Sequence, residues 1–364
     1  MYSESDHAFM SRALQLAARA MNIATPNPRV GCVIVRDGRV LGEGSTQPPG
    51  SNHAEIEALQ DARRSGHDVR GATVYVSLEP CSHFGRTPPC STALIESHVA
   101  RVIAAVEDPN PVVFGRGLEM LRSGGIDVRC GLLEQEAADL NVGFFSRMRR
   151  GRPWVRLKIA ASLDGRTALP NGVSQWITSD DARADGHAWR ARSCAVLTGI
   201  GTVKADNPQL NVRLVETPRQ PLRVLVDSRL EVDPAARIFD GAGSVLVAHA
   251  VKSAPRTAVL VERGCEVVHL PGPGSKVDLP ALMTNLAARG INELHVEAGF
   301  KLNGSLLDAG VADELLVYLA PMLIGDGQGM VALPPLAELT QARRLVLREI
   351  TQVGEDVRLL ARLQ

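Results

Sequence analysis

Three features of the sequence predict an α/β protein built from two domains. The chain has 364 residues, which exceeds the usual size of one hydrophobic core and suggests about two domains at roughly 150 residues each. Apolar runs of strand length alternate with amphipathic stretches of helix length, as expected for sheets covered by helices. Residues 147–153 interrupt this alternation with basic side chains, a glycine and a proline. This interruption predicts a boundary, with domains at 1–147 and 153–364.

The first domain shows the alternation from its start to its end. Its apolar runs predict strands at 30–35, 73–78, 101–106 and 126–130. Its amphipathic stretches predict helices at 54–64, 91–97 and 118–123. We therefore expect a mostly parallel sheet covered by helices, which is a three-layer α/β domain.

The second half repeats the rhythm and is expected to be α/β as well. Strands are predicted at 154–160, 195–198, 222–226, 244–248, 266–270, 293–296 and 314–319. The stretch Thr178-Ser179-Asp180-Asp181 should open a helix that runs to about Arg192, because a hydroxyl cap followed by early carboxylates suits the exposed N–H groups and the helix dipole. Another helix is predicted near 281–289.

Composition and charge exclude several classes of protein. Lys and Arg total 40, as do Asp and Glu, so the net charge is 0 and no overall field draws the chain to nucleic acid or to anionic membrane. The N-terminus lacks the basic start and apolar run of a secretory signal. No apolar run approaches the roughly 18 residues of a membrane span. We expect a cytoplasmic protein whose 6 cysteines are thiols or metal ligands rather than disulfides.

The strongest chemical signal lies in the first domain. His53-Ala54-Glu55 is followed by a Pro80-Cys81 pair and then by Cys90 after two prolines. This fits the zinc-deaminase pattern of a His-x-Glu with a later Pro-Cys pair, except that 8 residues instead of 2 separate the cysteines. We expect His53, Cys81 and Cys90 to be zinc ligands, with Cys90 at a helix start that favours the thiolate.

These residue types match the chemistry of a catalytic metal. Two thiolates and one imidazole fill three corners of tetrahedral zinc and leave the fourth for water. Zinc lowers the pKa of that water to about 7. A carboxylate two residues beyond the histidine is placed to accept the water's proton and pass it to the ring nitrogen and the departing amine. Glu55 is therefore the expected proton shuttle.

Other interpretations exist for each residue taken alone. Cys81 and Cys90 could be core thiols and His53 a surface cap, but their combination with Glu55 and the prolines favours the metal site. His83 lies between the cysteines, and we expect a loop role for it because a fourth ligand would close the site. The remaining cysteines lack partners at ligand spacing and are expected to be buried small hydrophobes. They are Cys32, Cys130, Cys194 and Cys265.

The longer cysteine loop resembles that of a known family. Residues 80–90, Pro-Cys-Ser-His-Phe-Gly-Arg-Thr-Pro-Pro-Cys, are similar to the elongated zinc loop of the bifunctional deaminase/reductases of riboflavin biosynthesis. The resemblance continues at 25–35 and 107–111 and covers nearly the entire second half, at 161–168, 174–179, 202–208 and 297–299. Together these motifs are highly specific.

The resemblance implies a cytidine-deaminase-like first domain. The implied reaction is hydrolytic removal of an amino group from the pyrimidine of 2,5-diamino-6-(5-phosphoribosylamino)pyrimidin-4(3H)-one, which yields a uracil and ammonia. Asn27, Asp108 and Asn110 would line the pyrimidine site, although turn roles compete for the two proline-flanked asparagines. Relatives commonly carry His and Pro where this chain has Thr46 and Asn52. This departure concerns substrate contacts of the loop at 44–52 and not the metal.

The residues of the second half give only a weak signal for a dinucleotide. Residues 199–204 fail the Gly-x-Gly-x-x-Gly fingerprint at its last position. A better phosphate site is 297–304, where a strand ending near Val296 turns through Gly299 into a helix whose first N–H groups can cradle phosphate. Taken alone, this is an ordinary strand-to-helix turn.

The resemblance strengthens that signal, because the family's second domain is similar to dihydrofolate reductase. It implies NADPH-dependent reduction of the ribosyl group of 5-amino-6-(5-phosphoribosylamino)uracil to ribityl, with hydride delivered to the sugar's C1 carbon. The implied substrate contacts are Ser174, Arg190, Leu210, Arg213 and Glu297, whose arginines suit a phosphate. The implied NADPH contacts are Ala161, Trp176, Thr202, Asp206, Ser228, Gly299, Phe300, Lys301, Leu302, Asn303, Gly304 and Ser305. Trp176 would equally suit a core, and Asp206 is also a hypothetical aid to proton transfer.

Two further classes of function compete with this one. A nucleic-acid base deaminase with a non-catalytic accessory domain shares the zinc chemistry, but zero net charge and 4% aromatic residues speak against a strand-binding surface. The second half could also be a ligand-binding or oligomerisation module without activity. We expect small phosphorylated pyrimidines as partners, no nucleic acid and no membrane. The resemblance further implies a homo-oligomer, since the family often forms dimers or tetramers.

Overall fold

The computed structural model describes residues 2–82 and 89–364. The chain divides into two compact units, Met1–Gly151 and Arg152–Gln364. The last element of the first unit is helix α6 (Val142–Arg150), which ends at Gly151 in the left-handed region with a φ of 65°. Among the described residues, no helix combines the length and the apolar character that crossing a membrane requires.

The first unit contains a five-stranded sheet in the order β2-β1-β3-β4-β5. Its strands are β1 (Gly31–Arg36), β2 (Arg39–Ser45), β3 (Thr73–Val76), β4 (Arg101–Ala104) and β5 (Asp127–Cys130). The pairs β3-β4 and β4-β5 are parallel, as predicted. Strand β1 is antiparallel to both β2 and β3, so the expectation of a mostly parallel sheet is wrong for this half of it.

A tight hairpin explains the antiparallel pair. Strand β2 was not predicted, and it follows β1 after only Asp37 and Gly38, which have φ values of 53° and 73°. Two consecutive residues with positive φ form the turn that joins antiparallel strands, and Asp-Gly is a strong sequence signal for it. A crossover helix, which parallel pairing requires, has no room in a two-residue connection.

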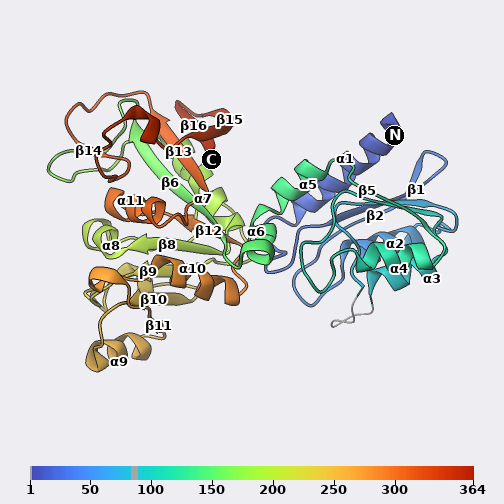
Figure 1. The fold of residues 1–364 in the computed structure, drawn as a ribbon, viewed down its shortest axis with the longest axis horizontal. Coiled ribbons are helices and arrows are strands. Elements are labelled where there is room, and N and C mark those ends of the chain that lie inside the picture. Colours follow the sequence, from blue (N-terminus) through green and yellow to red (C-terminus); the bar gives the residue numbers. More distant parts are fainter. Residues whose placement is uncertain (1, 83–88) are drawn as a thin grey trace. The chain divides into compact units, whose positions relative to one another are not determined.

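Helices cover both faces of this sheet, which confirms the three-layer prediction (Figure 1). Helices α1 (Glu4–Arg19) and α5 (Glu134–Leu140) lie on one face. Helices α2 (Ala54–Arg64), α3 (Cys90–Glu96) and α4 (Arg116–Ser123) lie on the other. Glycine permits close approach on both sides, since a Cβ at Gly31 would lie 1.9 Å from a carbonyl oxygen of α1 and one at Gly44 would lie 2.2 Å from a carbonyl oxygen of α2.

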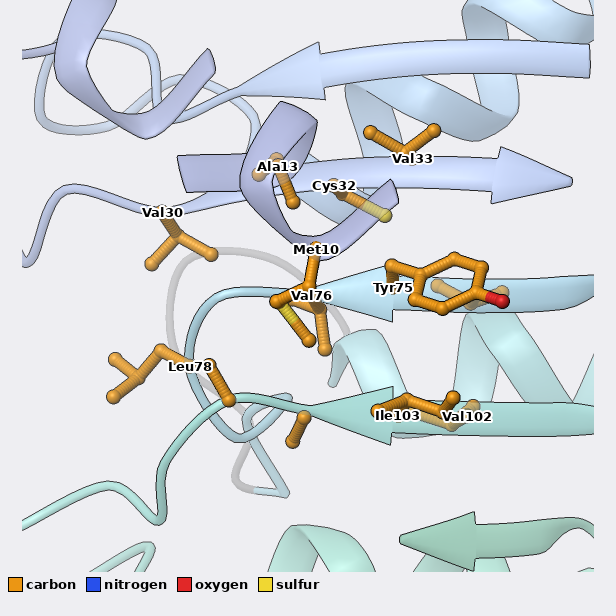
Figure 2. Packing of buried hydrophobic residues seen from close by; sticks show 14 of the residues in the cluster. Met10, Ala13, Val30, Cys32, Val33, Tyr75, Val76, Leu78, Val102 and Ile103 are labelled. Carbon is orange, nitrogen blue, oxygen red and sulfur yellow. The ribbon is translucent and has the colours of Figure 1, made fainter. Parts of the chain in front are cut away.

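The core of the first unit lies between these layers. Met10 and Ala13 of α1 pack over β1 and β3 near Cys32 and Val76, as Figure 2 shows. Cys32 is fully buried, as predicted for a cysteine without ligand partners. This continuous apolar layer supports the strand ends from which the polar loops of the unit emerge.

The second unit is built on a nine-stranded sheet in the order β11-β10-β9-β8-β12-β6-β13-β16-β15. All seven predicted strands occur in its parallel part. They are β6 (Trp154–Ser162), β8 (Ala195–Gly199), β9 (Leu222–Val226), β10 (Val245–His249), β11 (Glu266–His269), β12 (Glu293–Val296) and β13 (Glu314–Ala320). The prediction of α/β structure for this half is therefore confirmed.

The helices of the second unit connect these strands. They are α7 (Asp180–Arg192), α8 (Ile200–Asp206), α9 (Ala254–Glu262), α10 (Leu279–Ala288) and α11 (Phe300–Asp308), with short 3₁₀ turns at Arg237–Phe239, Pro273–Ser275 and Leu339–Gln341. Ser179 caps α7 as predicted, since its side chain accepts a hydrogen bond from the Ala182 N–H at 3.3 Å. The Ser179 hydroxyl also donates to the Asp356 carboxylate at 2.7 Å, which ties the start of α7 to the C-terminal strand.

Four strands of this unit were not predicted. Strands β15 (Leu345–Val353) and β16 (Asp356–Leu363) form an antiparallel hairpin that extends the sheet beyond β13. Strands β7 (Arg166–Ala168) and β14 (Gln328–Gly329) form a separate small ribbon. The residues of β15 are mostly exposed and do not alternate apolar with polar, so the sequence pattern for a half-buried strand is absent.

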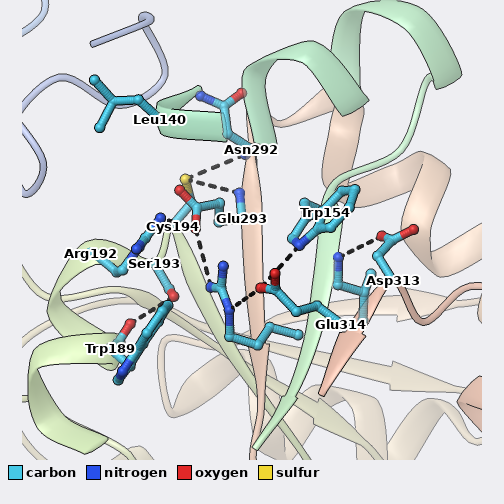
Figure 3. A network of polar contacts seen from close by, with 12 residues as sticks. Leu140, Trp154, Trp189, Arg192, Ser193, Cys194, Asn292, Glu293, Asp313 and Glu314 are labelled. Carbon is cyan, nitrogen blue, oxygen red and sulfur yellow. Dashed lines mark hydrogen bonds and ion pairs between the residues drawn. The ribbon is translucent and has the colours of Figure 1, made fainter. Parts of the chain in front are cut away.

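A buried charge network lies where β6, β12 and β13 begin (Figure 3). Arg156 is only 2% exposed and contacts Glu293 at 3.1 Å and Glu314 at 2.7 Å. The Trp154 indole N–H also donates to Glu314, at 3.3 Å. The guanidinium of Arg156 lies 4.4 Å from the ring centroid of Trp189. Charges this deeply buried require such partners, which the three strands supply together.

Candidate active sites

Three predicted ligands converge in the first unit. His53 is the residue before α2, Cys81 follows β3 by five positions, and Cys90 is the first residue of α3. The His53 Nδ1 atom lies 3.6 Å from the Cys81 sulfur and 3.3 Å from the Cys90 sulfur. One donor atom from each of the three residues lies within 4.8 Å of the others. The fold thus gathers donors that are far apart in the sequence.

The spacing of these donors fits a tetrahedral zinc ion. Zinc bonds of about 2.3 Å to sulfur and 2.0–2.1 Å to nitrogen put tetrahedral S and N ligands about 3.6 Å apart. The observed separations match this value, and one imidazole with two thiolates is a common set of ligands for catalytic zinc. His83, considered as a fourth ligand, lies outside the described residues.

Glu55 lies in the first turn of α2 and is buried. Burial, together with the negative charge of Cys81, raises the pKa of Glu55 to about 7. A carboxyl group with a pKa near neutrality can both accept and release a proton at physiological pH. The position of Glu55 beside the ligands therefore suits the shuttle role predicted for it.

The two thiols interact directly, and their pKa values move in opposite directions. The hydrogen bond from the Cys90 thiol lowers the pKa of Cys81 to about 4. The same interaction, together with burial, raises the pKa of Cys90. The backbone N–H of Cys90 also donates to the Cys81 sulfur, at 3.3 Å. The lowered pKa of Cys81 favours the thiolate, which is the form that binds metal.

Asp108 and Asn110 lie in the loop after β4. Asp108 is buried, and burial raises its pKa to about 6, with smaller contributions from the charges of Glu79 and Cys81. Asp108 accepts a hydrogen bond from the Asn110 N–H at 2.8 Å. Asn110 in turn accepts one from the Val112 N–H at 3.1 Å. Asn110 therefore has the turn role that was weighed for it, and substrate contact by either residue stays a prediction.

Asn27 lies half-buried in the loop that leads into β1. Its backbone N–H donates to the carbonyl of Ala24 at 2.9 Å, a turn contact. The nearby Thr46 is buried, donates to the Pro28 carbonyl at 3.1 Å and accepts from the Val30 N–H at 2.9 Å. Thr46 thus braces the backbone just after Asn27.

Two asparagines hold loops of the first unit by their side chains. Asn52 donates to the Glu57 carboxylate at 2.8 Å. Asn141 accepts from the Arg29 N–H at 2.7 Å and donates to the Arg29 carbonyl at 2.8 Å. No sequence signal pointed to Asn141, because its contact with Arg29 spans 112 positions.

Glu79 is the most extensively bonded residue near this site that sequence reasoning missed. Its buried carboxylate accepts from four backbone N–H groups of the segment 108–118. The signal available in the sequence was its position, two residues before the Cys81 ligand.

A cavity of about 1340 Å³ opens in the second unit at the carboxyl ends of β6, β8, β9 and β12. This is the edge of an open parallel sheet where ligands generally bind. The volume exceeds the roughly 300–1,000 Å³ of most single-ligand pockets. The predicted residues among its lining are Ser174, Trp176, Arg190, Thr202, Asp206, Leu210, Arg213, Ser228, Glu297, Gly299, Phe300, Lys301, Leu302, Asn303 and Ser305.

Two predicted cofactor residues do not line this cavity. Ala161 is fully buried in the sheet and packs with Ile159 and Val317. Gly304 lies inside α11, where an added Cβ would be 1.9 Å from the carbonyl oxygen of Ala332. Gly304 is therefore required for close packing of the chain, and cofactor contact by either residue stays a prediction.

Trp176 belongs to the cavity and not to a core. It is 64% exposed, so the core alternative weighed for it is wrong. The guanidinium of Arg183 lies 4.5 Å from its ring centroid. An exposed indole at the mouth of a cavity offers a flat apolar surface to a ligand.

An ion pair dominates the electrostatics of the cavity. Arg190 contacts Glu297 through two hydrogen bonds, one of them 2.8 Å between Nη2 and Oε2. Burial acts to raise the pKa of Glu297, but the charge of Arg190 and its hydrogen bonds outweigh burial and hold that pKa well below its usual value. Glu297 is thus a carboxylate throughout the physiological range.

Two basic residues of the cavity wall were missed from the sequence. Burial lowers the pKa of Lys158, whose ammonium lies 5.6 Å from the ring centroid of Tyr318. A lysine inside the apolar strand β6 was the available signal. Burial and the charge of Arg190 lower the pKa of His187 to about 4, so its neutral ring accepts the Arg213 N–H at 3.2 Å.

Comparison with known proteins covers both halves. The model of the cytidine and deoxycytidylate deaminase zinc-binding region matches residues 3–106, and that of the RibD C-terminal domain matches residues 153–359. The riboflavin biosynthesis protein RibD of Haemophilus influenzae is 46% identical, covering 98% of this chain and 97% of that protein. RibD of Escherichia coli is 47% identical, covering 97% of this chain and 98% of that protein.

Solved structures agree with these sequence comparisons. Acinetobacter baumannii RibD superimposes with a TM-score of 0.90 at 39% identity and 99% coverage of both chains. The diaminohydroxyphosphoribosylaminopyrimidine deaminase/5-amino-6-(5-phosphoribosylamino)uracil reductase of Thermotoga maritima superimposes with a TM-score of 0.88 at 34% identity, again with 99% coverage of both. The chain therefore belongs to the RibD family, the bifunctional deaminase/reductases of riboflavin biosynthesis.

Proposed function

We propose that the two activities of this enzyme reside in separate domains, the zinc-dependent deaminase in 1–147 and the NADPH-dependent reductase in 153–364. The enzyme acts on small phosphorylated pyrimidines in riboflavin biosynthesis. A nucleic-acid base deaminase with an inactive second half is not favoured, because bifunctional relatives match the chain over nearly its whole length.

His53, Cys81 and Cys90 hold the zinc ion in this proposal. The observation that carries it is the donor spacing, with separations of 3.6 and 3.3 Å from the histidine nitrogen to the two sulfurs. Zinc supplies a bound water with a pKa of about 7. With zinc bound, Glu55 would accept one proton from the water as the oxygen adds to the amino-bearing ring carbon, and would pass it to the ring nitrogen. It would then accept the second proton, from the hydroxyl of the adduct, and give it to the amine, which leaves as ammonia while the new C–O bond becomes a carbonyl.

Substrate recognition by the deaminase is assigned to Asn27, Asp108 and Asn110. Their short polar side chains can match the donor and acceptor edges of a pyrimidine. The raised pKa of Asp108, about 6, makes this residue able to donate as well as accept near neutral pH. The three residues come from two loops that leave the same sheet as Cys81.

The large cavity of the second unit is assigned to NADPH and the deaminated pyrimidine. NADPH supplies the hydride that reduces the ribosyl group. We assign cofactor contact to Trp176, Thr202, Asp206 and Ser228 and to the turn and helix start at 299–305. Ala161, which is buried in β6, is assigned to the cofactor on the family resemblance alone. Backbone N–H groups at the start of α11 suit the phosphates of the cofactor.

Substrate contact in this cavity is assigned to Ser174, Arg190, Leu210, Arg213 and Glu297. Arg213 has the planar, charged group that suits the substrate phosphate. The Arg190–Glu297 pair presents a fixed carboxylate toward the same space. Its role is to orient the sugar for hydride delivery.

We also propose a homo-oligomer. Strand β15 forms the edge of the nine-stranded sheet and exposes Leu345, Val346, Leu347 and Ile350, the last of them 63% exposed. Apolar edge strands are templates for pairing with another chain. Light scattering at several concentrations measures the oligomeric state, and a mass of 39.0 kDa at all of them would reject association. Cytoplasmic location is proposed because two cysteines must stay reduced to hold zinc.

Mass analysis of the products tests both halves together. The diaminopyrimidine substrate should yield the deaminated ribosyl compound without NADPH and the deaminated ribityl compound with it. Removal of zinc with a chelator should abolish the first step and leave reduction of preformed deaminated substrate intact. Undiminished deamination by metal-free enzyme would reject the zinc assignment, and absence of NADPH oxidation with the deaminated substrate would reject the reductase assignment.

A further inference from the structure

The carboxylate of Glu79 occupies an unusual position beside the deaminase site. It is 3% exposed and lies between the end of β3 and the zinc ligand Cys81. Oε2 accepts the N–H groups of Asp108 and Gly115, each at 3.0 Å. Oε1 accepts those of Gly117 at 2.8 Å and Leu118 at 3.3 Å. One side chain thus binds both ends of the segment 108–118.

That segment carries two of the residues assigned to the pyrimidine. Asp108, whose N–H is held by Glu79, accepts the Asn110 N–H at 2.8 Å. Asn110 accepts the Val112 N–H at 3.1 Å and so folds the turn on itself. A chain of hydrogen bonds therefore runs from Glu79 to both predicted substrate residues.

The other side of Glu79 is fixed to the metal ligands. Ser91, the residue after Cys90, donates through its hydroxyl to the Cys81 carbonyl at 2.9 Å. Gly117 lies so close to the segment 79–81 that an added Cβ would be 1.9 Å from the Pro80 carbonyl oxygen. The segments 79–81, 90–91 and 108–118 thus form one connected unit, and Glu79 is its central acceptor.

The four partners explain why a carboxylate stands here. An ionised carboxylate offers about four lone-pair sites and no donor, which matches four converging N–H groups. Hydrogen bonds to a charged acceptor offset the cost of burying it. A glutamine of the same shape would turn an NH₂ group toward two N–H donors. The position therefore requires the charge and not only the volume of the side chain.

We propose that Glu79 is a positioning residue of the deaminase, whose carboxylate holds the segment 108–118 so that Asp108 and Asn110 stand beside the zinc ligands before the pyrimidine binds. The proposal rests on the proposed function for its account of Asp108 and Asn110. Preorganised recognition groups lower the cost of binding, so the effect belongs mainly in KM.

The experiment compares Glu79→Gln with the wild-type enzyme. We expect the KM for the diaminopyrimidine to rise about tenfold, because this is the effect of losing roughly one well-made hydrogen bond to a charged group. The zinc content should stay that of the wild type, and NADPH-dependent reduction of preformed deaminated substrate should not change. Asp6→Asn is the matched control, because Asp6 is another buried carboxylate of the first unit and accepts the Ser3 N–H at 2.9 Å and the Tyr75 hydroxyl at 2.8 Å. Its KM should be unchanged.

Several results would overturn the proposal. The first is a KM in Glu79→Gln equal to that of the wild type. The second is a loss of zinc from Glu79→Gln that accounts for its lost deaminase activity. The third is a rise of KM in Asp6→Asn as large as that in Glu79→Gln. If Glu79→Gln does not fold, Glu79→Asp keeps the charge but is too short to serve both ends of the segment. In Glu79→Asp, a KM above that of the wild type but raised less than the tenfold expected for Glu79→Gln supports the proposal. A KM equal to that of the wild type overturns it.

A further variant separates this proposal from the proposed function. Asp108→Asn should also raise the KM if Asp108 contacts the pyrimidine. A wild-type KM in Asp108→Asn, together with a raised KM in Glu79→Gln, would reject substrate contact by Asp108 while supporting the positioning role of Glu79.

Discussion

Arg190 and Glu297 form a two-pronged ion pair in the wall of the large cavity of the second unit, although 107 positions separate them in the sequence. Arg190 comes from α7 and Glu297 from the end of β12. The pair keeps a buried carboxylate charged in a place where burial alone would favour the protonated form. A fixed negative charge at this position is a property of the pair and not of either residue.

Replacement of Arg190 should make reduction sensitive to pH. Arg190→Gln removes the strongest interaction that opposes burial and leaves the hydrogen bond of His295 and the charge of Lys158, so the pKa of Glu297 rises and the carboxylate is lost at a higher pH than in the wild type. The rate of NADPH oxidation should then decline with falling pH where the wild type stays level. Arg343→Gln is the control, since Arg343 pairs with Asp308 on the surface at 2.7 Å. Superimposable pH profiles of wild type and Arg190→Gln would contradict this account.

Removal of the Glu55 carboxylate should separate metal binding from chemistry. Glu55→Gln should retain zinc, because Glu55 is not among the three clustered donors. Ammonia release should fall by about 10²–10⁴-fold, the usual contribution of a general acid–base group. Reduction of preformed deaminated substrate should continue, and Asp61→Asn on the same helix should leave both activities unchanged. Loss of both activities in folded, metal-loaded Glu55→Gln would contradict independent sites.

Asp206 should contribute to the reductase. It ends α8, lines the cavity and accepts a hydrogen bond from Gln175 at 3.4 Å. Burial raises the pKa of Asp206, so a larger fraction of its carboxyl group is protonated at lower pH and can act as an acid. Asp206→Asn should lower the reductase turnover or the affinity for NADPH by about tenfold or more. Unchanged turnover and unchanged cofactor affinity, from NADPH oxidation and from a binding titration, would reject any role.

The buried Arg156 should contribute to stability and not to catalysis. Arg156→Met leaves Glu293 and Glu314 with one fewer buried cation, and breaking such a pair costs about 3–5 kcal/mol. All 3 tryptophans, Trp154, Trp176 and Trp189, belong to the second unit, so urea unfolding followed by tryptophan fluorescence reports on that unit. The triple variant Arg156→Met/Glu293→Gln/Glu314→Gln should recover part of the loss. An unchanged midpoint of urea unfolding in Arg156→Met would show that the ion pairs of Arg156 are energetically neutral.

The sequence predicted regular elements best where burial follows a simple period. All seven strands of the parallel part of the second unit were predicted within a few residues, and α2 was predicted at its observed bounds. The hairpin β15-β16 was missed because its exposed residues do not alternate. Strand β2 was missed although Asp37-Gly38 signals a hairpin, and with it the antiparallel half of the first sheet.

The donor cluster of His53, Cys81 and Cys90 could be predicted, together with Glu55 beside it, because metal chemistry limits residue type and spacing to a recognisable pattern. Glu79, Asn141 and His187 were not, because their hydrogen bonds join backbone groups 26 to 112 positions away. No local pattern encodes such contacts. The side chains that orient the site are therefore visible only once the chain is folded.

By itself, the sequence determined the α/β class, the two-part organisation, the type of metal chemistry and the family, since these depend on local periodicity and on short motifs. Only the tertiary structure decided that three donors meet at zinc-like distances, that Glu297 stays charged and that one carboxylate organises the loop beside the metal. The physical reason is that these properties arise from burial and from contacts between distant segments, which exist only when the chain has packed.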